Sequence, residues 1–152
     1  SSMSRRRSFV AEAELPASVE VAFATLADPS TAHVIDPAVR RYEPDAFPMA
    51  VGTRIRIAMT VFHLPLRAES VVVAWEPHRR MAMEATRPRW PVLVEAEHTF
   101  EPSANGCRYR WSLAATATGW PGRLLVGPFL RHMEVNARAQ QDRFAAMLRD
   151  RA

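Results

Sequence analysis

His98 is the residue of this sequence best placed to do chemistry. It stands in an alternating segment, 92–100, in which the residues on its own side are apolar: Val94, Ala96 and Phe100. Because successive side chains of a strand point to opposite faces, the pattern predicts that His98 points into the protein. An inward imidazole could act as an acid, a base or a hydrogen-bond anchor. The alternative is a core histidine satisfied by a backbone carbonyl or a water, which is the more frequent case. His98 is the one catalytic candidate, and the catalytic residues are otherwise unknown.

Further polar side chains could converge on the same space. Tyr109 and Trp111 share the inward face of the segment 107–115, and Asn136 and Gln140 lie on or beside the inner stripe of a C-terminal helix. An apolar pocket uses a few such groups to orient its ligand. The other predicted ligand-binding residues would give an adaptable apolar lining: Met59, Met83, Phe129 and Met133. Alternatively, the aromatic residues belong to the core with their polar ends at the rim, and the methionines fill gaps.

Several other chemistries lack the residues they need. His33 and Asp36 could share a helical face, but no HExxH motif or dense ligand cluster accompanies them or His63 and His132, so we expect no metal. The sequence has no Gly-x-Ser-x-Gly elbow and no phosphate-binding glycine loop. All 20 basic residues are arginines, which excludes a lysine Schiff base. We therefore expect no cofactor.

Length and composition indicate one globular domain. The chain has 152 residues, 48% of them hydrophobic, and no apolar run approaches the roughly 20 residues of a membrane span. We expect a single domain over 8–151 after a disordered tail of residues 1–7, in which Ser1 and Ser2 look like a cloning remnant. The single cysteine, Cys107, excludes an internal disulfide, which fits a cytoplasmic protein.

The charge pattern does not point to a polymeric partner. Net charge is +4, yet apart from Arg5 to Arg7 the arginines are scattered among acidic residues. Scattered charges are typical of a solvated surface, so we expect neither a nucleic-acid partner nor stable membrane insertion. The oligomeric state is left open, and a homodimer is compatible with the sequence.

A long amphipathic helix, predicted over 128–151, is the element around which the candidate residues must be arranged. Gly127 and Pro128 favour a start at this point, since proline fits the first helical turn. At about 1.5 Å per residue the helix would be roughly 35 Å long, so it needs a partner surface of that length. Its inner stripe recurs at spacings of three and four: Phe129, Leu130, Met133, Ala137, Gln140, Phe144, Met147 and Leu148.

Alternating segments predict the partner surface. Two short helices are expected after the first strand, one capped by Ser18 and one over 30–35. Tight connections between the later strands, such as Asn105-Gly106, favour an antiparallel sheet. The fold class is therefore α+β, with a curved antiparallel sheet of about seven strands around the C-terminal helix. The predicted strands are 8–15, 39–43, 54–61, 66–75, 81–86, 92–100 and 107–115.

This arrangement resembles the START-like superfamily, also called SRPBCC or Bet v 1-like, which has the helix-grip fold. Within it, the sequence looks like the bacterial polyketide cyclase/dehydrase and lipid-transport group. The resemblance covers about Phe9 to Leu148. It rests on the opening segment 9–16, Val21-Ala22-Phe23, Leu26-Ala27-Asp28-Pro29, Gly52-Thr53-Arg54, the turn Glu76 to Arg80, and His98-Thr99-Phe100-Glu101-Pro102 followed by Asn105-Gly106.

The resemblance implies a cavity between sheet and helix that holds an apolar or aromatic small molecule. The first hypothesis is therefore binding or transport of a lipid-like or polyketide-like ligand. The alternative is a polyketide aromatase/cyclase or related enzyme, so enzyme activity is left open. Such enzymes are thought to polarise a carbonyl with an inward arginine or tyrosine, but Arg54, Arg56 and Arg67 are expected to point to water. A partner-binding module that uses the basic tail is a third alternative.

Overall fold

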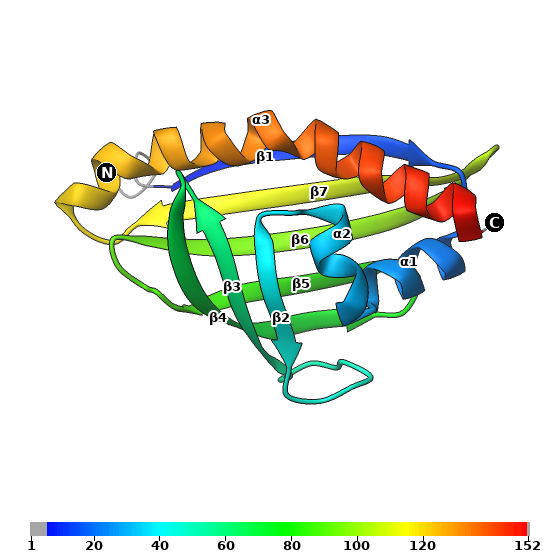
Figure 1. The fold of residues 1–152 in the computed structure, drawn as a ribbon, viewed down its shortest axis with the longest axis horizontal. Helices are drawn as coiled ribbons and strands as arrows, with labels where there is room; N and C mark the ends of the chain where they lie inside the picture. Colours follow the sequence, from blue (N-terminus) through cyan, green and yellow to red (C-terminus); the bar gives the residue numbers. More distant parts are fainter. Residues whose placement is uncertain (1–5, 152) are drawn as a thin grey trace.

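The computed structural model describes residues 6–151, and a curved seven-stranded antiparallel sheet is its framework (Figure 1). The strand order across the sheet is β1-β7-β6-β5-β4-β3-β2. The predicted α+β helix-grip class and all seven predicted strands are confirmed. Their bounds are β1 Arg6–Leu15, β2 Val39–Pro44, β3 Arg54–Val61, β4 Leu64–Glu76, β5 Arg80–Arg87, β6 Val92–Ser103 and β7 Gly106–Ala117.

Helix α3 spans Trp120–Arg151 and lies lengthwise along the sheet (Figure 1). The predicted start at Gly127 and Pro128 is wrong, because the helix begins at Trp120 and contains Pro128. Packing of the additional turns explains the difference. Gly122 is buried against the β5–β6 loop, so closely that a Cβ at this position would lie 2.0 Å from the Pro91 carbonyl oxygen. Burial of these turns outweighs the helical hydrogen bond that a proline removes.

The buried stripe of α3 contains four of the eight predicted residues, Leu130, Ala137, Phe144 and Leu148, and it departs from the prediction at Gln140. Gln141 is buried, at 5% exposure, whereas Gln140 is only half-buried. From Ala137, helical geometry allows a step of three or four residues on one face, and the packing selects the step of four. The Nε2 atom of Gln141 has no hydrogen-bond partner within residues 6–151. The stripe also contains Leu130, Phe144, Ala145 and Leu148.

The first strand begins earlier than predicted. Arg6 and Arg7, which were expected in the disordered tail, pair with Thr116 and Ala115 of β7. The strand therefore includes two residues of the predicted tail, and residues 1–5 lie outside the described part of the chain.

Two short helical segments follow β1, as predicted. Helix α1 (Val19–Ala27) begins after Ser18, whose hydroxyl oxygen accepts a hydrogen bond from the Val21 amide at 3.3 Å. A 3-10 turn, η2 (Pro29–Thr31), and helix α2 (Ala32–Ile35) complete the connection to β2. Asp28 links them, because its Oδ1 accepts from the Ser30 amide at 2.9 Å.

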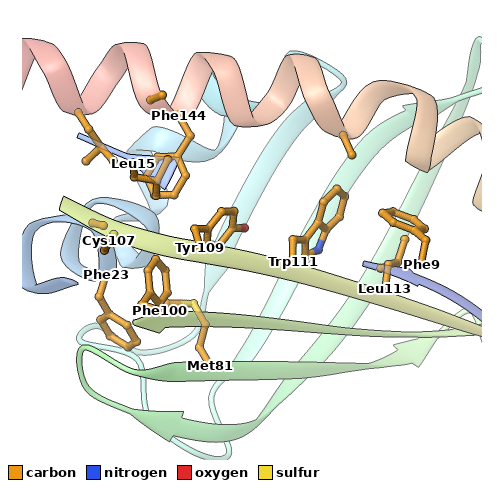
Figure 2. Close-up of a cluster of buried hydrophobic side chains, with 14 of the residues drawn as sticks. Phe9, Leu15, Phe23, Met81, Phe100, Cys107, Tyr109, Trp111, Leu113 and Phe144 are labelled. Atoms are coloured by element: carbon orange, nitrogen blue, oxygen red, sulfur yellow. The ribbon is translucent and has the colours of Figure 1, made fainter. Parts of the chain in front are cut away.

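Aromatic side chains fill one end of the space between the sheet and α3 (Figure 2). Tyr109 of β7 packs edge-on against Phe144 of α3, with ring centroids 5.4 Å apart. Phe100 of β6 contacts both Tyr109 and Phe23 of α1, at centroid distances of 5.2 and 5.6 Å. This cluster therefore fastens α1 and the C-terminal half of α3 to the sheet.

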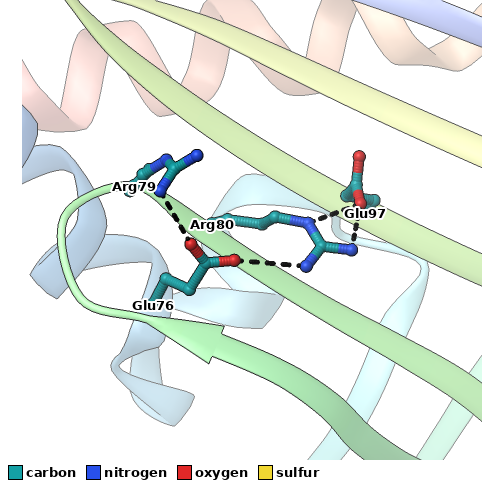
Figure 3. A network of polar contacts seen from close by, with 4 residues as sticks. All are labelled: Glu76, Arg79, Arg80 and Glu97. Atoms are coloured by element: carbon teal, nitrogen blue, oxygen red, sulfur yellow. Dashed lines mark hydrogen bonds and ion pairs between the residues drawn. The ribbon is translucent and has the colours of Figure 1, made fainter.

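An ionic network holds β4, β5 and β6 together on the solvent side of the sheet (Figure 3). Arg80 Nη1 lies 3.2 Å from Glu76 Oε2, and its Nη2 lies 2.7 Å from Glu97 Oε2. Arg79 binds the other carboxylate oxygen of Glu76 at 3.1 Å. Because neighbouring side chains of a strand point to opposite faces, fixing Glu97 outside directs His98 inward.

Candidate functional site

A cavity of about 710 Å³ lies between the inner face of the sheet and α3. Small-molecule sites have volumes of this order and combine a mostly apolar lining with a few polar groups. The lining here follows that pattern, since only five of its thirty residues carry a side-chain nitrogen or oxygen: Tyr42, Ser70, Arg87, His98 and Trp111.

Short side chains on the inward positions of the central strands leave this space open. Ser70 of β4 lies opposite Ala85 of β5, and Ala96 of β6 lies opposite Met83 of β5, the one long side chain of the four. All four line the cavity, as does Ala68 of β4. The serine and the three alanines cannot reach α3 from the sheet, whereas the aromatic rings at the other end do. The alternation of side chains along each strand therefore determines which residues face inward, and the size of those residues determines where a cavity remains.

His98 lies in the cavity wall and contacts Tyr109. Its Nδ1 atom is 2.6 Å from the Tyr109 hydroxyl oxygen, and the two rings are nearly parallel, with 10° between their planes. Trp111 is the direct cross-strand neighbour of His98, and their rings are 6.3 Å apart with 4° between the planes. These three side chains form one stacked group, with the indole and imidazole on the cavity.

Burial keeps the His98–Tyr109 pair uncharged. Desolvation lowers the pKa of His98 to about 4 and raises the pKa of Tyr109 above its ordinary value. His98 is only half-buried because one side of its ring borders the cavity. The cavity walls on that side are apolar, so desolvation still governs the charge. At neutral pH the pair is therefore a neutral imidazole and a neutral phenol.

The second ring nitrogen of His98 is available to a ligand. Its Nε2 atom makes no hydrogen bond within residues 6–151, and it is not among the fully buried unpaired atoms, so it is reached from the cavity. A neutral imidazole donates at one nitrogen and accepts at the other. His98 can therefore form one hydrogen bond to a carbonyl or hydroxyl group, while its low pKa makes it a weak base at neutral pH.

The structure brings together six of the nine predicted ligand-binding residues. Tyr109 does not line the cavity, because its ring is buried behind His98 and against Phe144. Asn136 and Gln140 do not line it either, because their side of α3 faces a second pocket. The six residues in the cavity wall are Met59, Met83, His98, Trp111, Phe129 and Met133.

The second pocket has a volume of about 390 Å³ and is the more polar of the two. Arg143 Nη1 donates to the Ile35 carbonyl at 3.4 Å, and Asn136 Nδ2 donates to the His132 carbonyl at 2.7 Å. Burial raises the pKa of Asp36, against the opposing effect of the Ala38 amide and the nearby cationic groups. The pocket adjoins the cavity through three residues that line both: Met59, Phe62 and Met133.

Sequence reasoning missed three polar residues of the cavity. Tyr42 had a usable signal, since it alternates with Arg41 and Glu43 in a predicted strand, and burial raises its pKa to about 12. Ser70 had none, because three consecutive valines blur the faces of its strand. Arg87 lies at the end of β5, where its side chain is 82% exposed and pairs with Glu69 at 3.8 Å. The arginines expected to point to water, Arg54, Arg56 and Arg67, are all exposed.

The histidines outside the cavity lie apart from other side chains that could bind a metal with them, in the described part of the chain. Within residues 6–151, no three His, Cys, Asp or Glu side chains are arranged so that they could hold a metal ion. His63, His132 and Asp36 line the second pocket, whereas His33 lies exposed on α2.

A long helix held by a curved antiparallel sheet, with an apolar cavity between them, defines the helix-grip class of proteins. The chain belongs to the family described as polyketide cyclase / dehydrase and lipid transport, whose model matches residues 6–151. The resemblance inferred from the sequence motifs is thereby confirmed. No curated protein matches the chain.

Solved structures of three different proteins share this fold. The di-domain ARO/CYC StfQ from the steffimycin biosynthetic pathway has a TM-score of 0.81 at 14% identity; the match covers 99% of this chain and 53% of StfQ, so this chain spans about half of it. Ara h 8.0201 has a TM-score of 0.73 at 11% identity, over 95% of this chain and 99% of the other. Norcoclaurine synthase from Thalictrum flavum, in complex with dopamine and hydroxybenzaldehyde, has a TM-score of 0.73 at 12% identity, over 97% and 88%. At such identities the likeness establishes the fold alone.

Proposed function

We propose that this protein binds and carries an apolar or aromatic small molecule, of the lipid or polyketide kind, in the cavity beneath α3. The observation that carries the proposal is the cavity of about 710 Å³ with five polar side chains among thirty. Membership of a family described by polyketide and lipid ligands supports the same class of molecule.

The apolar wall and His98 should contribute unequally to the free energy of ligand binding. A ligand that buries about 300 Å² of apolar surface gains roughly 7 kcal/mol before the costs of association. One hydrogen bond to His98 Nε2 adds only about 1 kcal/mol. Affinity should therefore follow the apolar area of the ligand, whereas its orientation should depend on His98.

A cavity-filling variant tests the proposal. Ala96→Phe places a phenyl ring inside the cavity, and Glu95→Phe places the same ring on the opposite face of β6 as the matched control. Binding is measured by displacement of an environment-sensitive fluorescent dye with fatty acids, flavonoids and aromatic polyketides. We expect at least a tenfold loss of affinity for Ala96→Phe and less than a twofold change for Glu95→Phe. Equal affinities of the two variants, or no ligand bound by the wild type, would refute carriage.

A second candidate is a polyketide aromatase/cyclase or a related enzyme. The observation that favours it is the His98–Tyr109 pair at the cavity wall. In a cyclisation, His98 Nε2 would take a proton from the carbon beside one carbonyl, and the carbanion would attack a second carbonyl of the same chain, whose oxygen is then protonated. The low pKa of His98 makes the first step unfavourable at neutral pH, which is why carriage ranks first. If His98→Ala leaves every turnover of a poly-β-ketone substrate intact, this candidate falls.

We also propose the bacterial cytoplasm as the location. The cysteine content is compatible with this location, because Cys107 is the single cysteine of the sequence and no internal disulfide can form. Fractionation of the cells that express the protein checks the location, and recovery of the protein in the periplasmic or membrane fraction would contradict it.

A further inference from the structure

Exposed residues in the cavity lining mark where the cavity opens. They belong to three segments: the β3–β4 turn (61–67), the β5–β6 loop (87–92) and the start of α3 with the residues before it (118–133). We call the exposed surface of these segments the mouth surface. The exposed lining residues are Phe62, Leu64, Pro65, Arg87 and Leu125.

The mouth surface is continuous. The Thr118 amide donates to the Pro91 carbonyl at 2.9 Å, and the Thr118 hydroxyl donates to the Arg89 carbonyl at 2.6 Å. The rings of Phe62 and His132 are 4.7 Å apart, which joins the β3–β4 turn to α3. The β5–β6 loop and the start of α3 lie at the same end of the molecule (Figure 1).

Large apolar side chains are concentrated on this surface. Among residues 6–151, seven Phe, Leu and Trp side chains are exposed, and six of them belong to the mouth surface; the seventh is Phe47 of the β2–β3 loop. Trp120 is 76% exposed and Trp90 is 61% exposed. The Trp90 indole lies against Gly119, the residue before Trp120, since a Cβ there would be 3.0 Å from its Nε1. Clustered exposed residues of this size mark an interaction site.

The charge of the mouth surface has one sign. The segments 61–67, 87–92 and 118–133 contain no Asp or Glu, although the chain has 16 acidic residues in all. The same segments contain five arginines: Arg67, Arg87, Arg89, Arg123 and Arg131. Of these, Arg87 has an acidic partner, Glu69, which lies outside the three segments.

We propose that the mouth surface docks on an anionic lipid bilayer, so that a ligand passes between the membrane and the cavity without crossing water. Tryptophan favours the level of the lipid headgroups, where its ring is in an apolar layer and its N–H is in a polar one. Arginines beside it are attracted to lipid phosphates and carboxylates. Docking is peripheral: within residues 6–151, every helix is too short or too polar to span the hydrocarbon core. The proposal rests on the proposed function only for the passage of a ligand.

Vesicle sedimentation tests the docking step by itself. The wild type is mixed with vesicles of phosphatidylcholine alone or with about one third phosphatidylserine, at low and high salt. The apolar variant is Trp90→Ser with Trp120→Ser, and the basic variant is Arg89→Gln with Arg123→Gln. The controls are single substitutions of exposed residues remote from the mouth surface, Phe47→Ser for the apolar variant and Arg149→Gln for the basic variant.

The wild type should bind phosphatidylserine vesicles at least tenfold more tightly than neutral ones, and high salt should weaken this binding. Each mouth variant should lose at least tenfold in vesicle affinity, and each control less than twofold. Equal binding to both vesicle types, or mouth variants that bind like the wild type, overturns the proposal. Sedimentation velocity can also overturn the proposal. It does so if the protein leaves vesicles unbound and the mouth surface instead pairs two copies of the chain or binds an acidic protein.

Ligand binding in solution without vesicles separates this inference from the proposed function. The mouth variants should bind a soluble ligand as the wild type does, because none of the four substituted residues lines the cavity. Vesicle binding without any ligand binding would refute carriage and leave docking standing. Ligand binding without vesicle binding would refute docking and leave carriage standing.

Discussion

The Nδ1 atom of His98 and the hydroxyl oxygen of Tyr109, 2.6 Å apart, join the filled and the hollow parts of the molecule. Tyr109 belongs to the filled part, where its ring packs against Phe144 of α3. His98 belongs to the cavity wall. The aromatic core thus holds the imidazole that faces the cavity, through the contact of His98 with Tyr109.

Removal of the Tyr109 hydroxyl should weaken the fold through His98. Tyr109→Phe leaves Nδ1 without its partner, so we expect the free energy of unfolding to fall by about 1–3 kcal/mol. Tyr42→Phe is the matched control, because the Tyr42 hydroxyl makes no hydrogen bond within residues 6–151, and it should change stability by less than about 0.5 kcal/mol. Urea denaturation measures both. Equal effects of the two substitutions would show that the hydrogen bond contributes nothing.

Stability should depend on pH through His98. Burial lowers its pKa to about 4 in the folded state, below its ordinary value near 6.5 in the unfolded chain. Between these values the unfolded state binds the additional proton, so the stabilisation is complete above about pH 6.5 and is lost as pH falls towards 4. The loss should reach roughly 3 kcal/mol. In denaturation curves across this range, His98→Gln should lack this component, and an unchanged slope in the variant would contradict the assignment.

Two glycines of α3 should respond oppositely to alanine. At Gly122 a Cβ would meet the Pro91 carbonyl oxygen at 2.0 Å, and a backbone atom cannot move aside, so Gly122→Ala should destabilise by about 2–3 kcal/mol. At Gly127 the nearest atom is the flexible guanidinium of Arg7, at 3.0 Å. Gly127→Ala should therefore leave stability unchanged or raise it by up to about 1 kcal/mol through helix propensity. Thermal unfolding compares them, and a tolerated Gly122→Ala would disprove the packing at the start of α3.

Replacing the buried amide of Gln141 with an apolar side chain should stabilise the protein. Its Nε2 atom lacks a partner within residues 6–151, and an unpaired buried N–H is costly, so Gln141→Met should raise the free energy of unfolding by about 1–2 kcal/mol. Gln140→Met, at the half-buried neighbouring position, should change it by less than about 0.5 kcal/mol. A loss of stability in Gln141→Met would mean that the amide is bound to water or to a ligand.

Much of the fold could be predicted because each prediction depended on neighbours in the chain. The alternation of 92–100 placed His98 on the inner face, and β6 has it there. Ser18 marked the start of α1 through a cap made three residues away. The inward direction of Trp111 followed from the same period of two. Local periodicity therefore identified the strands and their faces, while the resemblance to the family rested on particular motifs.

The sequence alone determined that a sheet and a long helix would enclose an apolar face. The reason is that the hydrophobic periods of strands and helices can be recognised within segments of ten or twenty residues. Only the tertiary structure decided that α3 starts at Trp120, that Gln141 replaces Gln140 in the core, and that Tyr109 stands behind His98. It also gathered arginines that look scattered along the chain into one surface around the cavity mouth. The reason is physical: a repeat of side chains specifies which way a residue faces, whereas depth and neighbours depend on how distant segments pack.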